Sequence, residues 1–476
     1  MFSYNFKYEL KLLLRSRWIQ LLSIILLLLF GFSTFNGLQK VEKRKKDIRA
    51  AYVEVQENDE KMLKLLDSVE RGMEVSVPRW TIPTSPMAVG NYHPRVAALE
   101  PQPMAFIATG QADLFTHYVK PKVSGNDFAM NFAEMTSPVQ LLFGSFDLAF
   151  VIIYLLPLLI IAFSYDILSA ERESGSLRLL AAQPIKIHTW VLQKLGLRFF
   201  WLTLLVVCSL TLVFLVIGLN PLGQLGVFFS LLLLTLGYML FWFSLAFLIN
   251  LGVGNSARNA VMLLGLWVAF VLLAPSLLNQ MGNTLYPMPS RTLMINEMRN
   301  LKAEVTERQD EILDNFLRDH PEYAINDTTQ FRGFYHRYMA SQRLIKEELS
   351  PIVDAYEAQL KERQDWVDQF KWISPAVIVQ ESLNQMAGTS TQDYENFRKQ
   401  VVRFAVGWRE HFMPFLYNNK NFTQEDYPEL PKFQYETKAY ASFATVPILF
   451  LISVGLFTIG VLFSGKTKKG ELLTSS

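Results

Sequence analysis

LAFVIIYLLPLLIIAFSY, the stretch from Leu148 to Tyr165, contains no charged residue and no histidine. A helix that crosses a bilayer needs roughly 20 predominantly apolar residues, and this stretch is close to that length. Five other stretches share its apolar character: Trp18 to Leu38, Phe199 to Leu219, Leu222 to Leu251, Ala260 to Leu278, and Ala439 to Phe463. The sequence therefore predicts an all-α polytopic membrane protein with six transmembrane helices.

The composition agrees with several membrane spans. Of the 476 residues, 51% are hydrophobic and only 18% are charged, against about 25% charged residues in an average soluble domain. The net charge of +2 does not favour a nucleic-acid partner. A single cysteine, Cys208, rules out a disulfide within the chain. Because no small-residue cleavage site follows the first apolar stretch, we expect a retained span there.

The loops between the spans predict the orientation in the membrane. Loops 39–147 and 280–438 are long and polar, and with six spans both lie on one side; the short loops 166–198 and 252–259 lie on the other side with both termini. The short-loop side carries Lys7, Lys11, Arg15, Arg17, Arg172, Arg178, Lys186, Lys194, Arg198, Arg258, Lys466, Lys468 and Lys469. The positive-inside rule therefore places both termini in the cytoplasm. A basic cluster at 40–46 opposes this assignment, but long loops cross the membrane largely regardless of charge.

The N-terminal residues predict an amphipathic helix before the first span. Phe2, Phe6, Leu10 and Leu13 fall on one helical face, and Lys7, Lys11 and Arg15 fall on the opposite one. Such a helix suits the membrane interface, although a simple basic leader also fits. The chain then divides into this helix at 1–17, a first span at 18–38, a first extracytoplasmic loop at 39–147, spans two to five at 148–279, a second extracytoplasmic loop at 280–438, a sixth span at 439–465, and a cytoplasmic tail at 466–476.

The two long loops predict a mixed, mainly helical extracytoplasmic domain. Residues 40–72 form a charged helical pattern, and the proline-rich stretch 76–138 predicts irregular structure with short strands. Apolar residues from Met294 to Phe316 recur at helical spacing with one gap of seven, and a second helix follows from about Phe331. Ser350-Pro351 predicts a helix start, with a third helix running to about Phe370.

No pattern in the chain predicts an enzyme. The six histidines are scattered, and no His-Glu-x-x-His or Cys-x-x-Cys spacing occurs. We therefore expect no catalytic, metal or cofactor-binding residues. The spans also lack the ionisable side chains with which ion-driven transporters bind their coupling ion. If the protein moves a substrate, we expect the energy to enter from outside the bilayer.

GVLFSGKT, from Gly460 to Thr467, matches the letters of a phosphate-binding P-loop. A P-loop needs a strand before it and a helix after it. Here the sixth span precedes the pattern, and only nine residues follow it. We therefore interpret Lys466 and its neighbours as the basic end of a span and not as a nucleotide site.

The short loop 166–198 contains DILSAERESGSLRLLAAQPI at its start. Ser174 or Ser176 can cap a short helix that ends before Pro184 and exposes Leu177 and Leu180. A charged start and exposed leucines suit docking into the groove of a partner protein. An ordinary amphipathic connector fits the same residues equally well.

SAERESGSLRLLAAQPI resembles the signature of ABC-2-type permeases, the membrane subunits of ABC exporters. That signature is Glu-(Arg/Lys)-Glu-x-Gly-(Thr/Ser)-Leu-x-x-Leu-Leu-x-x-Pro. The matching residues are Glu171, Arg172, Glu173, Gly175, Ser176, Leu177, Leu180 and Pro184. Serine stands at 176, where threonine is commoner. The resemblance implies that about 170–184 form a coupling helix that contacts a separate ABC ATPase subunit.

The resemblance extends over essentially the whole chain. LEPQPMAFIATGQADLFTHYVKPKVSG, from Leu99 to Gly125, resembles a bacterial subgroup of these permeases with a large extracytoplasmic domain of unknown function. It implies an inner-membrane exporter subunit that pairs with a second permease copy, identical or related, while ATP and Mg bind the partner ATPase. The alternative is a non-transporting scaffold or mechanical-relay subunit whose extracytoplasmic domain binds a partner. Neither interpretation indicates the substrate.

Overall fold

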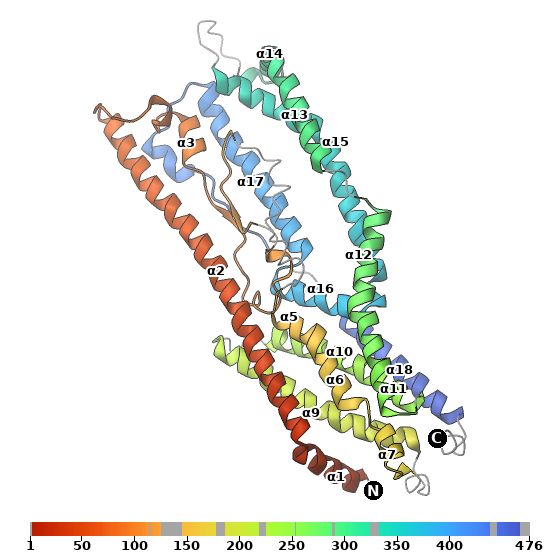
Figure 1. Ribbon diagram of the computed structural model, residues 1–476. Helices are drawn as coiled ribbons and strands as arrows, with labels where there is room; N and C mark the ends of the chain where they lie inside the picture. Colours follow the sequence, from red (N-terminus) through yellow and green to blue (C-terminus); the bar gives the residue numbers. More distant parts are fainter. Residues whose placement is uncertain are drawn as a thin grey trace.

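The computed structural model describes residues 2–113, 116–124, 145–177, 186–218, 225–252, 254–287, 291–323, 333–437 and 445–466. The molecule is elongated and helical, with an apolar helix bundle at one end (Figure 1). We call the described parts of 39–147 and 280–438, which extend away from the bundle, the head. Within the described residues, strands occur only as β1 (Ala97–Ala98), which pairs antiparallel with β2 (Tyr118–Val119). The predicted irregular structure with short strands is confirmed where this stretch is described.

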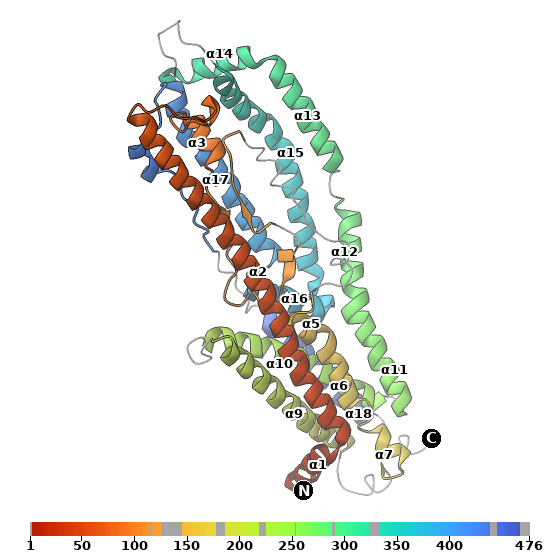
Figure 2. The same ribbon diagram turned by 60° about the vertical axis from the view of Figure 1, so that its left-hand side comes forward.

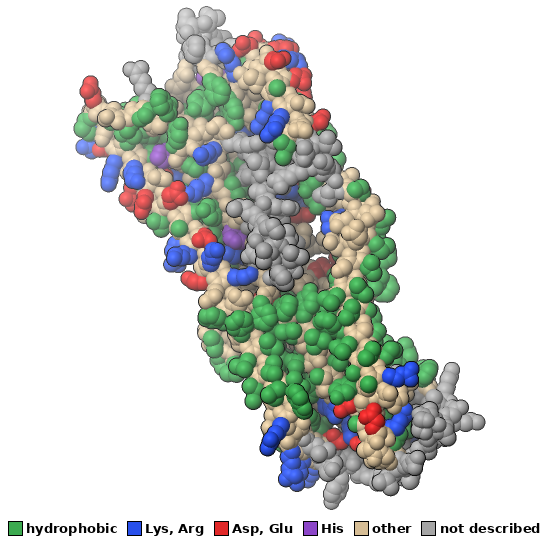
Figure 3. All heavy atoms as spheres, viewed as in Figure 1, with side chains coloured by type: hydrophobic (Ala, Val, Ile, Leu, Met, Phe, Trp, Pro, Cys, Tyr) green, Lys and Arg blue, Asp and Glu red, His purple; other side chains and the backbone are tan. Residues whose placement is uncertain are grey.

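Six helical segments are long and apolar enough to cross a membrane. They are α2 (Arg17–Glu70), the segment Leu148–Glu173, α9 (Ile187–Val216), α10 (Leu225–Gly252), the segment Ser256–Leu285, and α18, whose apolar part is Val446–Phe463. Exposed hydrophobic side chains cover this end of the molecule as a broad belt (Figure 3). The prediction of an all-α, multi-pass membrane protein is confirmed. The predicted start of the sixth span at 439 lies outside the described residues.

The helix α10 forms the centre of the bundle. It packs against α9, α18 (Val446–Lys466) and α6 (Leu156–Ser164), and its large side chains Tyr238, Trp242 and Phe247 are fully buried. A helix that is apolar all round is expected in such a buried position. Gly460 of α18 lies against it, because a Cβ there would come within 2.7 Å of the Phe247 ring. The described part of the P-loop-like pattern, residues 460–466, is therefore the end of a membrane helix.

The N-terminal helix and the first span meet at a sharp boundary. The helix α1 (Phe2–Arg15) ends just before Ser16, and α2 begins at Arg17. Leu13 is buried while Lys7 and Lys11 are exposed, as the amphipathic pattern predicts. At 1.5 Å per residue, the 54-residue α2 is about 80 Å long. It joins the first span and the predicted charged helix into one rod that reaches the far end of the head (Figure 2).

Two spans contain a π-helical turn before a proline. In the second span, α5 (Leu148–Phe150) and η4 (Val151–Leu155) precede Pro157 of α6; in the fifth, α11 (Ser256–Trp267) and η5 (Val268–Leu273) precede Pro275 of α12 (Ala274–Leu285). Proline has no N–H to donate to the carbonyl four residues earlier, and π-turns are a common response. Neighbouring side chains donate to carbonyls of both π-turns. The Tyr238 hydroxyl donates to the Ile153 carbonyl at 3.0 Å, and Ser374 Oγ donates to the Phe270 carbonyl at 2.7 Å.

The head is built mainly from long helices. Its elements are η1 (Arg79–Thr81), α3 (Pro86–Tyr92), η2 (Gly110–Asp113), α13 (Arg291–Glu307), α14 (Gln309–Asp319), η6 (Pro321–Tyr323), α15 (Phe334–Phe370), η7 (Lys371–Ile373), α16 (Pro375–Ala387), α17 (Thr391–Tyr417) and η8 (Gln424–Glu429). The seven-residue gap in the apolar pattern matches the break between α13 and α14. In the core of the head, Trp408 of α17 donates to the Gly90 carbonyl of α3 at 3.0 Å.

The predicted helix start at Ser350-Pro351 is wrong. The helix α15 is continuous from Phe334 to Phe370 with Pro351 in its interior, and Ser350 Oγ donates to Asp354 within the same helix at 3.1 Å. The helix α15 packs against α13, α14 and α17 in the head and against α12 of the fifth span. These contacts hold the helix together across a residue that locally favours a break.

Candidate functional site around α7

Of the predicted docking residues, those that the structure describes lie at the end of the bundle that also holds both ends of the described chain (Figure 1). The helix α7 (Ser169–Glu173) follows α6 after a turn. Asn250, fully buried in α10, bridges that turn. Its Nδ2 donates to the Ser164 carbonyl at 2.8 Å, and its Oδ1 accepts from the Leu168 N–H at 3.2 Å. One amide therefore satisfies backbone groups on both sides of the break between α6 and α7.

A second set of contacts joins α7 to the start of the fifth span. Arg172 Nη1 donates to the Gly254 carbonyl at 3.0 Å, and Glu173 Oε1 accepts from the Ser256 N–H at 2.8 Å. Ser256 Oγ donates to Ser169 Oγ at 2.8 Å, and Asn259 donates to the Tyr165 carbonyl at 2.9 Å. A carboxylate at the N-terminus of α11 is favoured because the first N–H groups of a helix are unpaired and carry partial positive charge.

A third contact joins α7 to α9 and α1. Lys194 Nζ lies 2.8 Å from Glu171 Oε1 and 2.9 Å from Glu9 Oε1. The same amine lies 4.2 Å from the centre of the Trp190 ring. Only 11% of the Lys194 side chain is exposed. A partly buried cation between two carboxylates is a stronger link than an exposed surface pair.

The turn after α7 is closed by Gly175 and Ser176. Ser174 is the C-cap of α7, and Gly175 has a φ of +76°, which favours glycine. Ser176 Oγ donates to the Glu171 carbonyl at 3.1 Å and to its carboxylate. Ser174 therefore ends α7, and most of the helix that Ser174 or Ser176 is expected to cap lies outside the described residues. Glu173, Ser174 and Gly175 form an exposed tip, which we call the α7 tip.

The structure brings most of the predicted docking residues together but changes the role of some. Leu177 was expected to be exposed, but it is buried against the bundle core. Leu180 and Pro184, with the rest of 178–184 in the predicted coupling helix, lie outside the described residues. Glu171, Arg172 and Glu173 each bond to another part of the bundle, so they hold α7 in place. Of the three, Glu173 is also exposed.

The sequence did not predict the residues whose hydrogen bonds and ion pairs hold α7 and the turn before it: Glu9, Lys194, Asn250, Gly254, Ser256 and Asn259. Asn250 and Asn259 are buried polar residues at the ends of apolar stretches, which is a signal the sequence did contain. Their partners are more than eighty residues away in the chain, so the pairing itself is tertiary. Within the described chain, no three His, Cys, Asp or Glu side chains lie close enough to hold one metal ion.

In the comparison with known proteins, one family model matches part of the chain. Residues 291–436, which run from α13 to beyond η8, match a family model described as a domain of unknown function, DUF3526. No curated protein and no solved structure matches the chain. The matched region belongs to the head and does not include α7.

Proposed function

We propose that this chain is the permease subunit of an ATP-driven, ABC-2-type exporter in a bacterial inner membrane. In this proposal the α7 end faces the cytoplasm, which agrees with the basic residues of the short loops. The observation that carries the proposal is the attachment of α7 to three parts of the bundle. The signature residues Glu171, Arg172 and Glu173 link it to α9, to α1 through Lys194, and to the start of the fifth span.

In this mechanism a separate ABC ATPase docks on the α7 tip and hydrolyses ATP with its own Mg. The chain contributes no catalytic group. Movement of the tip would pull on the cluster of Lys194, Glu171 and Glu9, which we call the Lys194 cluster, and on the N-terminus of α11. It would therefore act on several spans at once. A second permease copy, identical or related, would pair with this chain in the membrane and receive the second ATPase subunit.

One observation favours a second candidate function, mechanical relay to a partner outside the membrane. The rod α2 begins beside α1, which Glu9 ties to Lys194, and continues without a break to the end of the head (Figure 2). There Glu70 accepts from the Gln424 N–H at 3.1 Å. Movement at α7 can therefore reach the far end of the head through one helix. A relay subunit would show ATPase docking without net movement of a substrate.

Site-directed cross-linking tests the docking step. In a Cys208→Ser background, Ser174→Cys places the chain's single thiol on the α7 tip. When the full-length chain is purified with its ATPase subunit, we expect a reagent that couples to the thiol at one end and carries a photoreactive group at the other to join the two chains on illumination. Ser68→Cys, half-buried near the head end of α2, is the matched control and should give no such product. Absence of the product from Ser174→Cys in an intact complex would refute docking at the tip.

A double variant tests the coupling role. Glu171→Ala with Glu173→Ala should weaken co-purification of the ATPase or uncouple its hydrolysis from transport. The control, Glu304→Ala with Glu311→Ala, removes two exposed head carboxylates that pair with Arg308. Normal complex formation together with normal coupling in the Glu171/Glu173 variant would contradict the proposal.

A further inference from the structure

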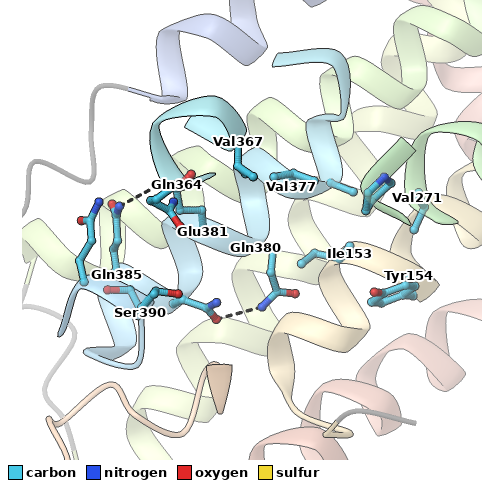
Figure 4. Close-up of a pocket in the computed structure, with 15 residues that line it drawn as sticks. Ile153, Tyr154, Val271, Gln364, Val367, Val377, Gln380, Glu381, Gln385 and Ser390 are labelled. Carbon is cyan, nitrogen blue, oxygen red and sulfur yellow. Dashed lines mark hydrogen bonds between the residues drawn. The ribbon is translucent and has the colours of Figure 1, made fainter. Parts of the chain in front are cut away.

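A cavity of about 210 Å³ lies where the head meets the second and fifth spans. Ile153 and Tyr154 of η4, Val271 of η5 and Pro275 of α12 line it from the membrane side. The helices α15, α16 and α17 line it from the head side. We call it the boundary cavity. Figure 4 shows Gln364, Gln385 and Ser390 at one side of it, Val271 and Tyr154 at the other, and Gln380 between them beside Ile153.

The position of the cavity relative to the bilayer follows from helix geometry. Tyr154 lies six residues inside the second span, counted from Leu148, which is about 9 Å along a helix. The cavity therefore begins within the apolar zone and ends among head residues that lie beyond it. A molecule that fills it has one end in each environment.

One face of α16 packs into the bundle core, and the other face lines the cavity. Ile378, Val379 and Leu383 are fully buried and belong to the bundle core. The residues of α16 that line the cavity are Ala376, Val377, Gln380, Glu381, Asn384 and Gln385. Their spacing of three and four residues places them on one face of the helix. Ser374 anchors the start of α16 to η5, so the polar face is held over the two π-turns.

The polar lining is rich in amides and hydroxyls. Besides the residues of α16, it contains Gln364, Ser390, Thr391 and Gln392. Two internal bonds are made, from Gln380 to Asn384 at 2.9 Å and from Gln385 to Glu381 at 3.2 Å. Each primary amide offers two donors and an oxygen with two lone pairs. These two bonds therefore leave hydrogen-bonding capacity on Gln380 and Asn384.

The cavity offers little charge to a ligand. Among its lining residues, all of which the structure describes, Glu381 is the only one with a charged side chain. Its carboxylate lies 3.0 Å from Lys371 Nζ, which also lies 2.9 Å from Asp368. The lining therefore presents no cation to balance a phosphate or a carboxylate, and burying an unpaired anion there would be costly.

We propose that the boundary cavity binds the uncharged, hydroxyl-rich head group of an amphipathic molecule, such as the sugar of a glycolipid. Hydroxyl groups both donate and accept, which matches the amides of α16, and the apolar chain would leave along the second and fifth spans. Leu272 and Leu273 of the fifth span, which follow the lining residue Val271 in the chain, are exposed, so the fifth span offers an apolar surface at this level. Binding is a property of this chain alone; only the step from bound ligand to exported cargo rests on the proposed function.

Lipid retention by the full-length chain tests the proposal. The chain is extracted from nanodiscs of phosphatidylcholine that contain either monoglucosyl diacylglycerol or phosphatidylglycerol, and bound lipids are counted by native mass spectrometry. We expect retention of the glucolipid but not of phosphatidylglycerol. Gln380→Leu with Asn384→Leu should reduce glucolipid retention at least about tenfold, because several hydrogen bonds to the sugar are lost. Gln56→Leu, an exposed glutamine of α2, should leave it unchanged.

A second variant and a competition experiment keep the test decisive. Gln364→Leu lies on α15 and leaves α16 intact, so it should also reduce retention even if the α16 variant folds poorly. Free methyl glucoside should compete only weakly, since it lacks the apolar part; competition equal to that of the whole lipid would overturn the amphipathic assignment. Equal retention of phosphatidylglycerol, or unchanged retention in both variants, would overturn the site. Because no ATPase is present, failure of ATPase docking would leave this result untouched.

Discussion

Lys194 Nζ lies 2.8 Å from Oε1 of Glu171, and this contact connects α9 to the helix that carries the permease-like signature. The same amine also holds Glu9 of α1 at 2.9 Å. Three elements that are separated in the chain therefore share one positive charge. Because the amine is mostly buried, removing it leaves two carboxylates close together with little water to screen them.

Replacing this amine should release α1 from the bundle. We expect Lys194→Met to lower the free energy of unfolding by about 2 kcal/mol. This loss is smaller than that for a fully buried ion pair because both carboxylates are partly exposed. Hydrogen exchange at 2–15 should rise in the purified chain. The triple variant Lys194→Met, Glu9→Gln and Glu171→Gln removes all three charges and should recover most of the protection. Unchanged exchange in the single variant would show that the cluster does not hold α1.

The π-turn in the second span predicts a dependence between Tyr238 and Pro157. Tyr238 donates to the Ile153 carbonyl, to which Pro157 has no N–H to offer. Tyr238→Phe should therefore destabilise the bundle by about 1–2 kcal/mol, since a buried polar group loses its partner. In a Pro157→Ala background the alanine N–H can donate to the Ile153 carbonyl in place of the Tyr238 hydroxyl, so Tyr238→Phe should destabilise the bundle much less. Thermal unfolding of the four proteins in one detergent measures this coupling; equal costs in both backgrounds would contradict it.

How much of this arrangement the sequence predicts depends on whether the signal is local. Absence of charge over about twenty residues is a local property, and so the stretch from Leu148 to Tyr165 identified a span correctly. The amphipathic residues before Arg17 identified α1 for the same reason. The pairing of Asn250 with the Ser164 carbonyl depends on how two spans pack, and no local pattern contains it.

The prediction at Pro351 failed because a local preference conflicted with packing. A serine followed by proline is a good helix start, yet α15 continues because α14, α17 and α12 pack along it. The α7 residues show a related limit. Their spacing matched a docking signature, but it could not reveal that Leu177 is buried or that Arg172 reaches the Gly254 carbonyl.

The head should lose stability as the pH falls through the range in which histidine titrates. Burial lowers the pKa of His93, with Asp59 opposing and Arg95 reinforcing the effect, and burial also lowers the pKa of His411, with Glu429 and Asp426 opposing it. In the unfolded chain a histidine titrates near pH 6.5. Below that pH the unfolded state binds more protons than the folded state, so stability is complete above about pH 6.5 and falls as the pH drops.

Hydrogen exchange at α3 and α17 measures this effect. Between about pH 7.5 and about pH 5.5, after correction for the intrinsic exchange rate, protection in the wild-type chain should decrease. The double variant His93→Gln and His411→Gln should show a smaller decrease, because neither glutamine titrates. A wild-type profile that stays flat would contradict the prediction. The lowered pKa of Asp426, where Lys420 and Thr423 outweigh burial, acts only in more acidic solution.

Two glycines of α2 should respond in opposite ways to the same substitution. A Cβ at Gly37 would lie 2.2 Å from the Phe106 carbonyl oxygen, which belongs to backbone that crosses α2 closely. Gly37→Ala must therefore separate two backbones, and we expect a loss of about 1–3 kcal/mol. Gly31 lies less than two turns away with nothing within 4 Å of its Cβ position, so Gly31→Ala should stabilise the helix by about 0.5–1 kcal/mol. Thermal unfolding of both variants tests the contrast, and equal shifts would show that α2 and the Phe106 segment are not in close contact.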